Sequence, residues 1–355
     1  MPRAKRTPGS RYRKPRTYRF GRRRGLSLPD LLAKLPNEES ARAYLERILW
    51  PHGPVCPHCQ YPQSQLGVVE GVLGIDHTPH KHIKANPEKR VRPGLWKCGR
   101  CSKQFTVTVG TIFEKTRVSL HKWLLAAFLF ASSKKGMSAM QIHRTIGVTY
   151  KTAWFMLHRL RHAMARLTDR PTSHSDYTLL GGDGRAVEAD EVYLGGRRTG
   201  VKSGFKGNKI AVVSVVERRG RVRSMSSERV TTATLDKALE TVRDDSVLMT
   251  DDLSLYRGVD RVFLAHRCVI HSAKQYVNGT THTNTVEGFF ANLRRGLDGI
   301  YHHVGQETLD QYLGEFDFRY NTRGLTDDER FDQMLSRGRG RRMTYKPAKG
   351  LVDAA

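Results

Sequence analysis

Acidic residues are scarce in this chain of 355 residues. Asp and Glu number 34 against 61 Lys and Arg, which gives a formal net charge of +27. Solubility does not require so large an excess of one sign, and a polyanionic partner is the simplest explanation. With 38% hydrophobic residues, the chain can still form packed cores, and its length suits two or three compact units.

Long apolar runs are missing as well. No run approaches the ~18 residues of a membrane span, and the first residues are charged without the apolar stretch of a signal peptide. We therefore expect the protein to stay inside the cell. Cysteine is rare too, and the five residues form two close pairs and one single residue. In a reducing compartment, this pattern favours a metal site over disulfides.

The basic residues are concentrated at the ends of the chain. Residues 1–25 contain eleven Lys or Arg and no acid, so we expect a disordered basic arm over residues 1–27 that contacts phosphates without reading sequence. A second basic tail is expected over residues 336–355. Next to the arm, apolar residues between Leu28 and Ile48 recur at helical intervals, which predicts two short helices.

The cysteine pairs read Cys56-Pro-His-Cys59 and Cys98-Gly-Arg-Cys101, with 38 residues between them. Each pair can hold one tetrahedral ion from a tight turn, and four thiolates suit Zn²⁺. Because four ligands leave no open position, we predict one structural Zn²⁺ in a unit that spans residues 28–112. Cys268 is expected to be a small core residue. Nearby histidines are competing ligands, although such a run is more often a polar loop: His58, His77, His80 and His82.

Residues 119–167 have a helical pattern throughout, within a domain expected over residues 113–170. Ser119–Ser132 is strongly apolar, Met137–Ile146 is amphipathic, and Gly147 turns the chain into a third helix that reaches Leu167. This order predicts a helix-turn-helix domain. The third helix should bury Ala153, Met156, Leu157, Leu160 and Met164. It should present to DNA a face made of Lys151, Thr152, His158, Arg159 and His162. A plain helical bundle with a solvated basic face is the alternative, and the charge of the chain favours DNA.

After Pro171 the pattern becomes strand-like. The expected order is three strands, a helix and a fourth strand, at Ala186–Leu194, Lys209–Glu217, Val222–Val230, Thr234–Arg243 and Val247–Thr250. Two more helices are expected over residues 285–295 and 306–319. This order is that of a ribonuclease H-like core, an α/β fold with a mixed sheet and flanking helices, over residues 178–335.

Three carboxylates fall on separate elements of this core. Asp190 lies inside the first strand, where an unpaired buried acid is costly; Asp251 ends the last strand; Glu287 lies early on a helix. Such a cluster repels itself, and Mg²⁺ or Mn²⁺ would relieve the repulsion and suit phosphodiester chemistry. Each acid alone also has a structural explanation. Glu191 and Asp252 adjoin the first two and replace them if the strand register shifts by one.

A glycine-rich basic segment follows the first strand. We expect it to lie over DNA beside the carboxylates through Arg197, Arg198, Lys202, Lys206 and Lys209. A mobile hairpin loop without this role is the alternative.

Five stretches of the sequence resemble the prokaryotic insertion-sequence transposases that carry an N-terminal zinc ribbon. They are Trp50–Cys59, Gly147–Trp154, Asp190–Gly196, His282–Phe290 and Phe318–Arg323. Several motifs that agree in order are more specific than any one, and the resemblance spans roughly residues 28–335. It implies a DDE catalytic domain of ribonuclease H-like fold, with Asp190, Asp251 and Glu287 as metal ligands.

The resemblance also implies Lys or Arg near the reacting phosphate, and Arg294 holds that position seven residues after Glu287, on the same helix face. Some members use Asn as the third ligand, and Asn284 is close to Glu287; we favour Glu287 for its charge. The segment between the cysteine pairs is longer than is usual in the group.

The implied function is that of a DNA transposase. The zinc ribbon and the helix-turn-helix would recognise transposon ends in double-stranded DNA, and the carboxylates would activate water to cut, leaving a 3′-hydroxyl that attacks target DNA. Two or more protomers would hold two ends, in the cytoplasm at the nucleoid. The alternatives are a non-catalytic DNA-binding regulator, which would not require the three acids, and a structure-specific nuclease without strand transfer.

Overall fold

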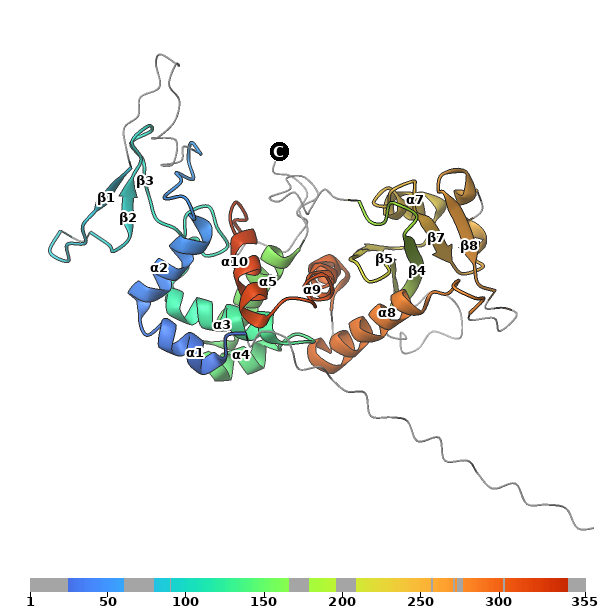
Figure 1. Ribbon diagram of the computed structural model, residues 1–355. Helices are drawn as coiled ribbons and strands as arrows, with labels where there is room; N and C mark the ends of the chain where they lie inside the picture. The colour runs from blue at the N-terminus through green and yellow to red at the C-terminus, as the bar shows by residue number, and fades with distance from the viewer. Residues whose placement is uncertain are drawn as a thin grey trace, which may run out of the picture.

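The computed structural model describes residues 25–60, 80–89, 91–165, 179–195, 209–256, 258–270, 272, 277–302 and 304–343. Figure 1 shows two lobes, with a small sheet and most of the helices in one and a larger sheet in the other. No helix in these ranges is long and apolar enough to cross a membrane. Outside them lie the expected basic arm up to residue 24, His77, the end of the basic tail, and Arg197, Arg198, Lys202 and Lys206.

The two short helices predicted after the arm are present. Helices α1 (Leu28–Lys34) and α2 (Glu38–Leu49) both begin at capping boxes, in which the side chains of Ser27 and Asn37 accept hydrogen bonds from the backbone three residues on. Such caps satisfy N–H groups that have no partner inside the helix. The chain then enters a small antiparallel sheet with the order β1 (Lys81–Ile83), β2 (Leu95–Lys97) and β3 (Gln104–Phe105).

Three helices follow in the predicted order: α3 (Leu120–Ser132), α4 (Ala139–Ile146) and α5 (Tyr150–Met164). Side chains of Ser119, Ser138 and Thr149 cap their N-termini. Gly147 ends α4 with φ of 63°, a left-handed conformation in which glycine has no steric cost. The inward face predicted for α5 is confirmed, since its apolar members are all buried: Ala153, Met156, Leu157, Leu160 and Met164.

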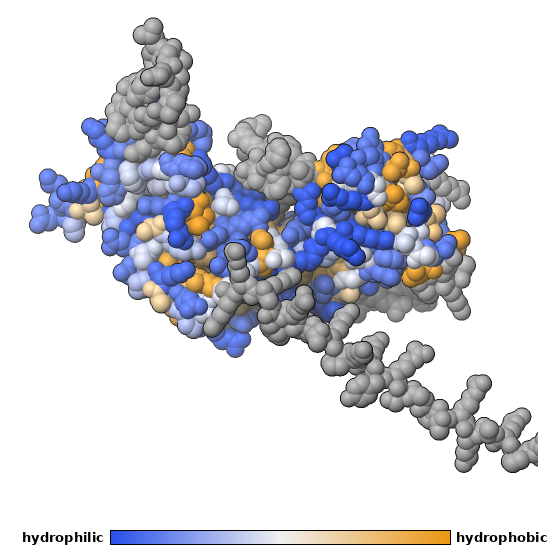
Figure 2. Space-filling view, viewed as in Figure 1, coloured by the Kyte–Doolittle hydropathy of each residue, from blue (hydrophilic) through white to orange (hydrophobic). Residues whose placement is uncertain are grey.

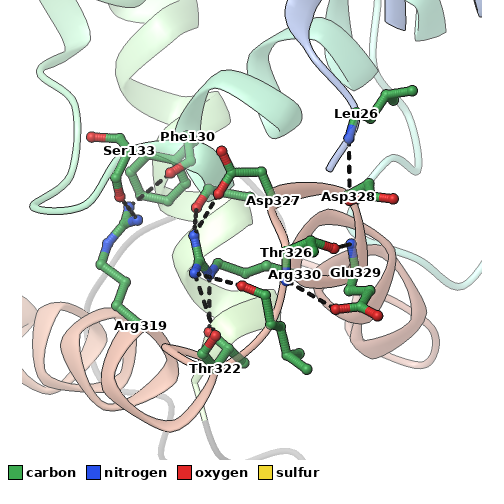
Figure 3. A network of polar contacts seen from close by, with 12 residues as sticks. Leu26, Phe130, Ser133, Arg319, Thr322, Thr326, Asp327, Asp328, Glu329 and Arg330 are labelled. Atoms are coloured by element: carbon green, nitrogen blue, oxygen red, sulfur yellow. Dashed lines mark hydrogen bonds and ion pairs between the residues drawn. The ribbon is translucent and has the colours of Figure 1, made fainter. Parts of the chain in front are cut away.

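Helix α10 (Asp327–Arg337) belongs to the core of this helical lobe. Its residues Phe331, Met334 and Leu335 are buried in the same cluster as the apolar faces of α1 to α5. Figure 3 shows the polar contacts around its start, where Arg330 donates to the carbonyl oxygen of Ala131 at 3.3 Å and to Thr322, near the end of the preceding helix. The far end of the sequence therefore completes a core that begins at residue 28.

The larger sheet has five strands in the order β6-β5-β4-β7-β8. Strand β4 pairs antiparallel with β5 and parallel with β7, so the sheet is mixed, and the predicted fold class is confirmed. The strand bounds are β4 Ala186–Leu194, β5 Ile210–Glu217, β6 Val222–Ser227, β7 Val247–Thr250 and β8 Ala265–Cys268. Strand β8 was not predicted from the sequence.

Helices cover both faces of this sheet. Alternate residues of β4 and β5 divide between two cores: Val187, Ala189 and Val213 pack with α7 (Thr232–Leu239), and Val192 and Val212 pack with the opposite helices. Those helices are α8 (Asn284–Gly296) and α9 (Leu309–Asn321). Short 3-10 turns occupy Ser254–Tyr256, Val259–Arg261 and Gln306–Thr308, and a π-helical turn follows α8 at Leu297–Tyr301.

Side chains of α9 satisfy the free edge of β6. Asn321 accepts from the Val222 N–H at 2.7 Å, Asp317 from Ser224 N–H at 2.8 Å, and Asp310 from Ser226 N–H at 3.1 Å. An uncovered edge strand is a template for pairing with another chain. The residues that bond this edge lie on α9 between the lobes (Figure 1), so the edge cap also joins the lobes.

The first residues of the expected basic tail pack against the helical lobe. Arg341 is 2% exposed and donates to the carbonyl oxygens of His162 at 2.6 Å and Ala163 at 3.1 Å, at the end of α5. A cation at a helix C-terminus meets carbonyls that lack partners and the negative end of the helix dipole. The prediction of a tail from residue 336 is therefore wrong for residues 336–343.

Candidate active site and zinc site

The four cysteines predicted as zinc ligands converge beside the small sheet. The Sγ atoms of Cys56 and Cys101 lie 3.7 Å apart, those of Cys59 and Cys98 lie 3.6 Å apart, and all four lie within 4.8 Å of one another. A tetrahedral Zn²⁺ with Zn–S bonds of about 2.3 Å requires sulfurs about 3.8 Å apart. The cluster therefore fits one closed zinc site, and the separations are too long for disulfides.

The competing histidines that the structure describes, His58, His80 and His82, do not join this cluster. His80 is buried, and its Nδ1 accepts a hydrogen bond from the N–H of Gly99, inside the second cysteine turn, at 3.2 Å. The ring of His82 packs against Trp96 at 4.9 Å, and His58 lies 3.4 Å from the carbonyl oxygen of Gln104. His80 therefore supports the turn that carries two ligands.

Two predicted carboxylates meet at one end of the larger sheet. Asp190 lies in β4 opposite Ser214 of β5, on the face covered by α8, and Asp251 follows the last residue of β7, the parallel neighbour of β4. Carboxylate oxygens of Asp190, Glu191 and Asp251 all lie within 4.8 Å of one another. Glu191, which the sequence offered only as an alternative in a shifted register, therefore joins the cluster with no shift.

Burial and repulsion act together on these acids. Burial, together with the charges of Glu191, Asp251 and Glu287, raises the pKa of Asp190 to about 7. Burial also raises the pKa of Glu191 to about 7, with a contribution from Asp251. A cation placed among these oxygens would offset both the burial of the negative charges and the repulsion between them. The donor set therefore fits a divalent metal such as Mg²⁺ or Mn²⁺.

Groups around the cluster fix its geometry. Asp190 Oδ1 accepts from the N–H of Glu191 at 2.8 Å, and Asp251 Oδ1 accepts from the N–H of Leu253 at 3.1 Å. The hydroxyl of Tyr256, a buried residue that the sequence did not single out, lies 3.4 Å from Glu191 Oε2. Burial and the neighbouring carboxylates raise the pKa of Tyr256 well above its usual value, so it remains a donor.

The third predicted ligand is on α8. Glu287 lies in the first turn of this helix and is exposed, and its Oε1 accepts from the hydroxyl of Thr283 at 2.9 Å. The charge of Glu287 contributes to the raised pKa of Asp190. Asn284, the alternative ligand, is exposed on the same first turn, and Arg294 is exposed in the last turn. The exposed face of α8 thus carries all three residues.

The DNA-facing side of α5 is smaller than predicted. Lys151 is exposed and Thr152 is half-buried, but His158 and Arg159 are 1% and 5% exposed, so the prediction that they face outward is wrong. Arg159 Nη1 donates to the carbonyl oxygens of Ile112 at 2.8 Å and Glu114 at 2.9 Å, which gives the buried guanidinium part of the hydrogen bonding that it requires. The exposed residues of α5 are Tyr150 and Lys151 in its first turn, and Trp154; His162 is half-buried.

An open hollow of about 650 Å³ lies beside that first turn. Its lining includes Arg117, Lys122, His143, Thr149 and Thr152. Figure 2 shows hydrophilic residues over most of the visible face, with smaller hydrophobic areas on both lobes. Lys209, at the start of β5, is also exposed.

The single cysteine is not a core residue. Cys268 ends the edge strand β8 and is exposed, so the prediction that it packs in the core is wrong. The reason is the position of β8, which has a neighbour on one side only.

Two domain families match the chain. Residues 179–321 match the ISXO2-like transposase domain, and residues 36–67 match the transposase zinc-ribbon domain. The second match includes Cys56 and Cys59 and ends before the other pair, which the fold brings to the same site.

Similar proteins come from mobile elements and viruses. A relative from Halobacterium salinarum, described as an uncharacterized protein in transposable element ISH50, is 26% identical over 303 residues, which are 80% of this chain and 90% of that protein. The Mos1 strand transfer complex covers 58% of this chain and 72% of its own, with a TM-score of 0.25 and 13% identity. A simian T-cell lymphotropic virus intasome in complex with PP2A regulatory subunit B56 gamma covers 53% and 66%, with a TM-score of 0.26 and 14% identity.

The assignment rests on the two domain matches and on the relative, not on the weak structural similarities. Together the domain matches and the relative support an insertion-sequence transposase with an N-terminal zinc ribbon and a DDE domain.

Proposed function

We propose that this transposase cuts phosphodiester bonds at the ends of its own element and joins the resulting 3′-hydroxyl groups to target DNA. Asp190, Asp251 and Glu287 would hold the divalent metal ions, and the Cys56, Cys59, Cys98 and Cys101 cluster would hold one structural Zn²⁺. The observation that carries the proposal is that carboxylate oxygens of Asp190 and Glu191, in the middle of β4, and of Asp251, just after β7, lie within 4.8 Å of one another. Separate elements rarely bring buried like charges together unless a cation compensates them.

Glu191 is a candidate fourth ligand in this site. Its carboxylate shares the cluster, and the Tyr256 hydroxyl holds one of its oxygens. Mg²⁺ or Mn²⁺ bound there would lower the pKa of the attacking water or hydroxyl and stabilise charge on the scissile phosphate. Arg294, on the exposed face of α8, would bind a DNA phosphate and orient the strand beside the carboxylates.

DNA would be held mainly through its phosphates. Thr152 at the start of α5 lines the hollow together with Arg117 and Lys122, and Lys151 lines a neighbouring hollow that Arg117 and Thr152 share. An α-helix start with cations beside it suits a phosphate backbone. On the other lobe, Lys209 would approach DNA next to the site; the segment with Arg197, Arg198, Lys202 and Lys206 lies outside the described residues. We propose at least a homodimer, since two ends must be joined, acting in the cytoplasm at the nucleoid.

The test uses purified full-length protein and a supercoiled plasmid that carries the gene with its flanking DNA. We expect cleavage at both flanks and joining to a second plasmid in Mg²⁺, both lost by at least about 1,000-fold in Asp190→Asn. Asp252→Asn is the matched control, because Asp252 adjoins Asp251 and bonds Ser272 at 2.7 Å instead of entering the cluster. It should retain most activity.

Three outcomes decide between the candidate functions. Cleavage and joining by Asp190→Asn at the wild-type rate would refute the assigned site. Cleavage by the wild type without joined product at any plasmid concentration would identify a nuclease. Binding of the flanking DNA without cleavage in Mg²⁺ or Mn²⁺ would identify a regulator.

A further inference from the structure

Glu188 is a fully buried carboxylate two residues before Asp190. It is 0% exposed in the middle of β4, on the sheet face that α8 covers. A buried charge of this kind requires strong partners. Glu188 is not a member of the carboxylate cluster of Asp190, Glu191 and Asp251, so metal binding in that cluster does not account for its burial.

Its partners lie at the start of α8. Glu188 Oε2 accepts from the backbone N–H groups of Thr285 at 2.7 Å and Val286 at 3.0 Å, and Oε1 accepts from the Thr285 hydroxyl at 2.8 Å. These are N–H groups of the first helical turn, which have no acceptor inside the helix. The residue at the usual capping position, Thr283, makes no side-chain cap. Glu188 therefore caps α8 from a different element.

Arg218 completes the arrangement from the turn after β5. Its Nε donates to Glu188 Oε1 at 2.6 Å, and its two terminal nitrogens donate to the carbonyl oxygens of Thr280 at 2.7 Å and His282 at 2.9 Å. The guanidinium thus holds the segment that leads into α8, while Glu188 holds the helix start. His282 Nδ1 also lies 3.2 Å from Glu188 Oε1.

We propose that Glu188, with Arg218, is a positioning residue for the first turn of α8. It would fix the distance between β4, which carries Asp190, and the turn of α8 that carries Asn284 and Glu287. This inference rests on the proposed metal site. One strand carries both the first ligand and the cap, so the distance between the ligands from β4 and α8 depends on a single rigid element. Groups that orient metal ligands in this way change metal affinity or activity by about 10–100-fold when removed.

The first readout needs neither metal nor DNA. In metal-free full-length protein, hydrogen exchange of the amides of residues 285–288 should become about 10-fold faster or more in Glu188→Ala, because the N–H groups of Thr285 and Val286 lose their acceptor. Glu188→Gln retains one acceptor oxygen and should show a smaller increase. Glu217→Gln is the matched control: Glu217 is a buried glutamate of the same sheet, and its carboxylate bonds Arg185.

The second readout is Mn²⁺ binding, measured by calorimetry with the ion alone. We expect the dissociation constant to rise about 10–100-fold in Glu188→Ala and less in Glu188→Gln. If Glu188→Ala does not fold, as judged by circular dichroism and zinc content, Thr285→Val and Arg218→Lys test the same contacts singly. Unchanged exchange and unchanged Mn²⁺ affinity in the folded variants would overturn the proposal. Lost Mn²⁺ binding with unchanged exchange would also overturn it, since that result describes a direct ligand.

Asp190→Asn separates this proposal from the proposed function. Its Mn²⁺ binding should be lost while exchange at residues 285–288 stays at the wild-type rate. Wild-type Mn²⁺ affinity in Asp190→Asn would refute the assigned metal site, and the exchange data on Glu188→Ala would still decide whether Glu188 caps α8.

Discussion

At the scale of single residues, basic side chains in this chain serve two different purposes. Lys151 meets solvent at the start of α5, whereas Arg159 and Arg341 are buried and donate to backbone carbonyl oxygens. A guanidinium has five N–H donors in fixed directions and can satisfy several carbonyls at once, which a lysine ammonium cannot match in geometry. Part of the excess of positive charge is therefore structural.

His158 is the buried residue with the clearest consequence for pH. Its Nδ1 lies 2.8 Å from Gln311 Oε1, and its ring packs between Trp154 and Tyr312. Burial, together with the charge of Arg161, lowers the pKa of His158 to about 4. The unfolded chain takes up this proton near pH 6.5, so stability is complete above pH 6.5 and is lost as the pH falls towards 4.

We predict that His158→Gln flattens this dependence. The wild type should lose on the order of 3 kcal/mol more than the variant between pH 7 and pH 4, measured as the free energy of unfolding in urea. The comparison cancels loss of zinc and titration of His162, whose pKa burial also lowers to about 4. Parallel pH curves for the two proteins would show that His158 is protonated without cost in the folded state.

At the scale of elements, helix α9 caps the free edge of the larger sheet. Its side chains bond three alternate N–H groups of β6, and Asn321 also donates to the carbonyl oxygen of Val222 at 3.1 Å. Asp317 makes two of the bonds, to the N–H and, at 2.7 Å, to the hydroxyl of Ser224. The helix therefore replaces a sixth strand.

Asp317→Ala should expose this edge. We expect a loss of about 1–3 kcal/mol in stability, because the Ser224 groups lose their acceptor, and reversible association of the protein through paired β6 strands. Light scattering over a range of protein concentrations measures the association. Asp317→Asn retains one acceptor and serves as the control; association equal in both variants, or absent in Asp317→Ala, would argue against the edge cap.

Elements with a strong local pattern could be predicted from the sequence, and those that depend on distant partners could not. The capped helices α3 to α5 and strands β4, β5 and β7 follow from hydrophobic periodicity and from caps such as Thr149. Strand β8 was missed because Ala265–Cys268 is short, polar at an edge, and flanked by no turn signal. Burial of Arg159 was missed because its partners lie 45 and 47 residues away in sequence.

The same limit applies to the candidate site. Asp190 and Asp251 could be chosen because each lies in or after an apolar strand, where an acid is out of place. Glu188 lies in the same strand as Asp190, but its proposed positioning role depends on hydrogen bonds from Thr285 and Val286, which are 97 and 98 residues further along the sequence. No local pattern marks that contact.

At the scale of the whole molecule, a buried ion network joins the two lobes. Glu315 of α9 is 0% exposed; it bonds Arg161 of α5 at 2.7 Å, Arg319 at 2.8 Å and the Tyr301 hydroxyl at 2.6 Å. Arg319 continues to the end of α3, where it donates to the carbonyl oxygens of Phe130 and Ser133 (Figure 3). The two arginines and the neighbouring hydroxyl hold the pKa of Glu315 below its usual value despite burial.

This network fixes α5 relative to the larger sheet, because Glu315 of α9 binds Arg161 of α5 and α9 covers β6. If DNA binds at the start of α5, where Lys151 is exposed, its binding point would therefore lie at a fixed distance from the carboxylates. Since the interface is polar and fully buried, its members depend strongly on one another.

Glu315→Gln should for this reason be one of the most damaging single changes in the chain. It leaves Arg161, 2% exposed, without its carboxylate, and removing one partner of a buried pair costs about 3–5 kcal/mol. We expect unfolding in urea to change from one transition to two, as the lobes lose their coupling, with circular dichroism and tryptophan fluorescence no longer coincident. Asp245→Asn, which removes the exposed pair with Arg243, is the control and should leave the free energy of unfolding nearly unchanged. A single transition at the wild-type midpoint in Glu315→Gln would mean that apolar packing alone couples the lobes.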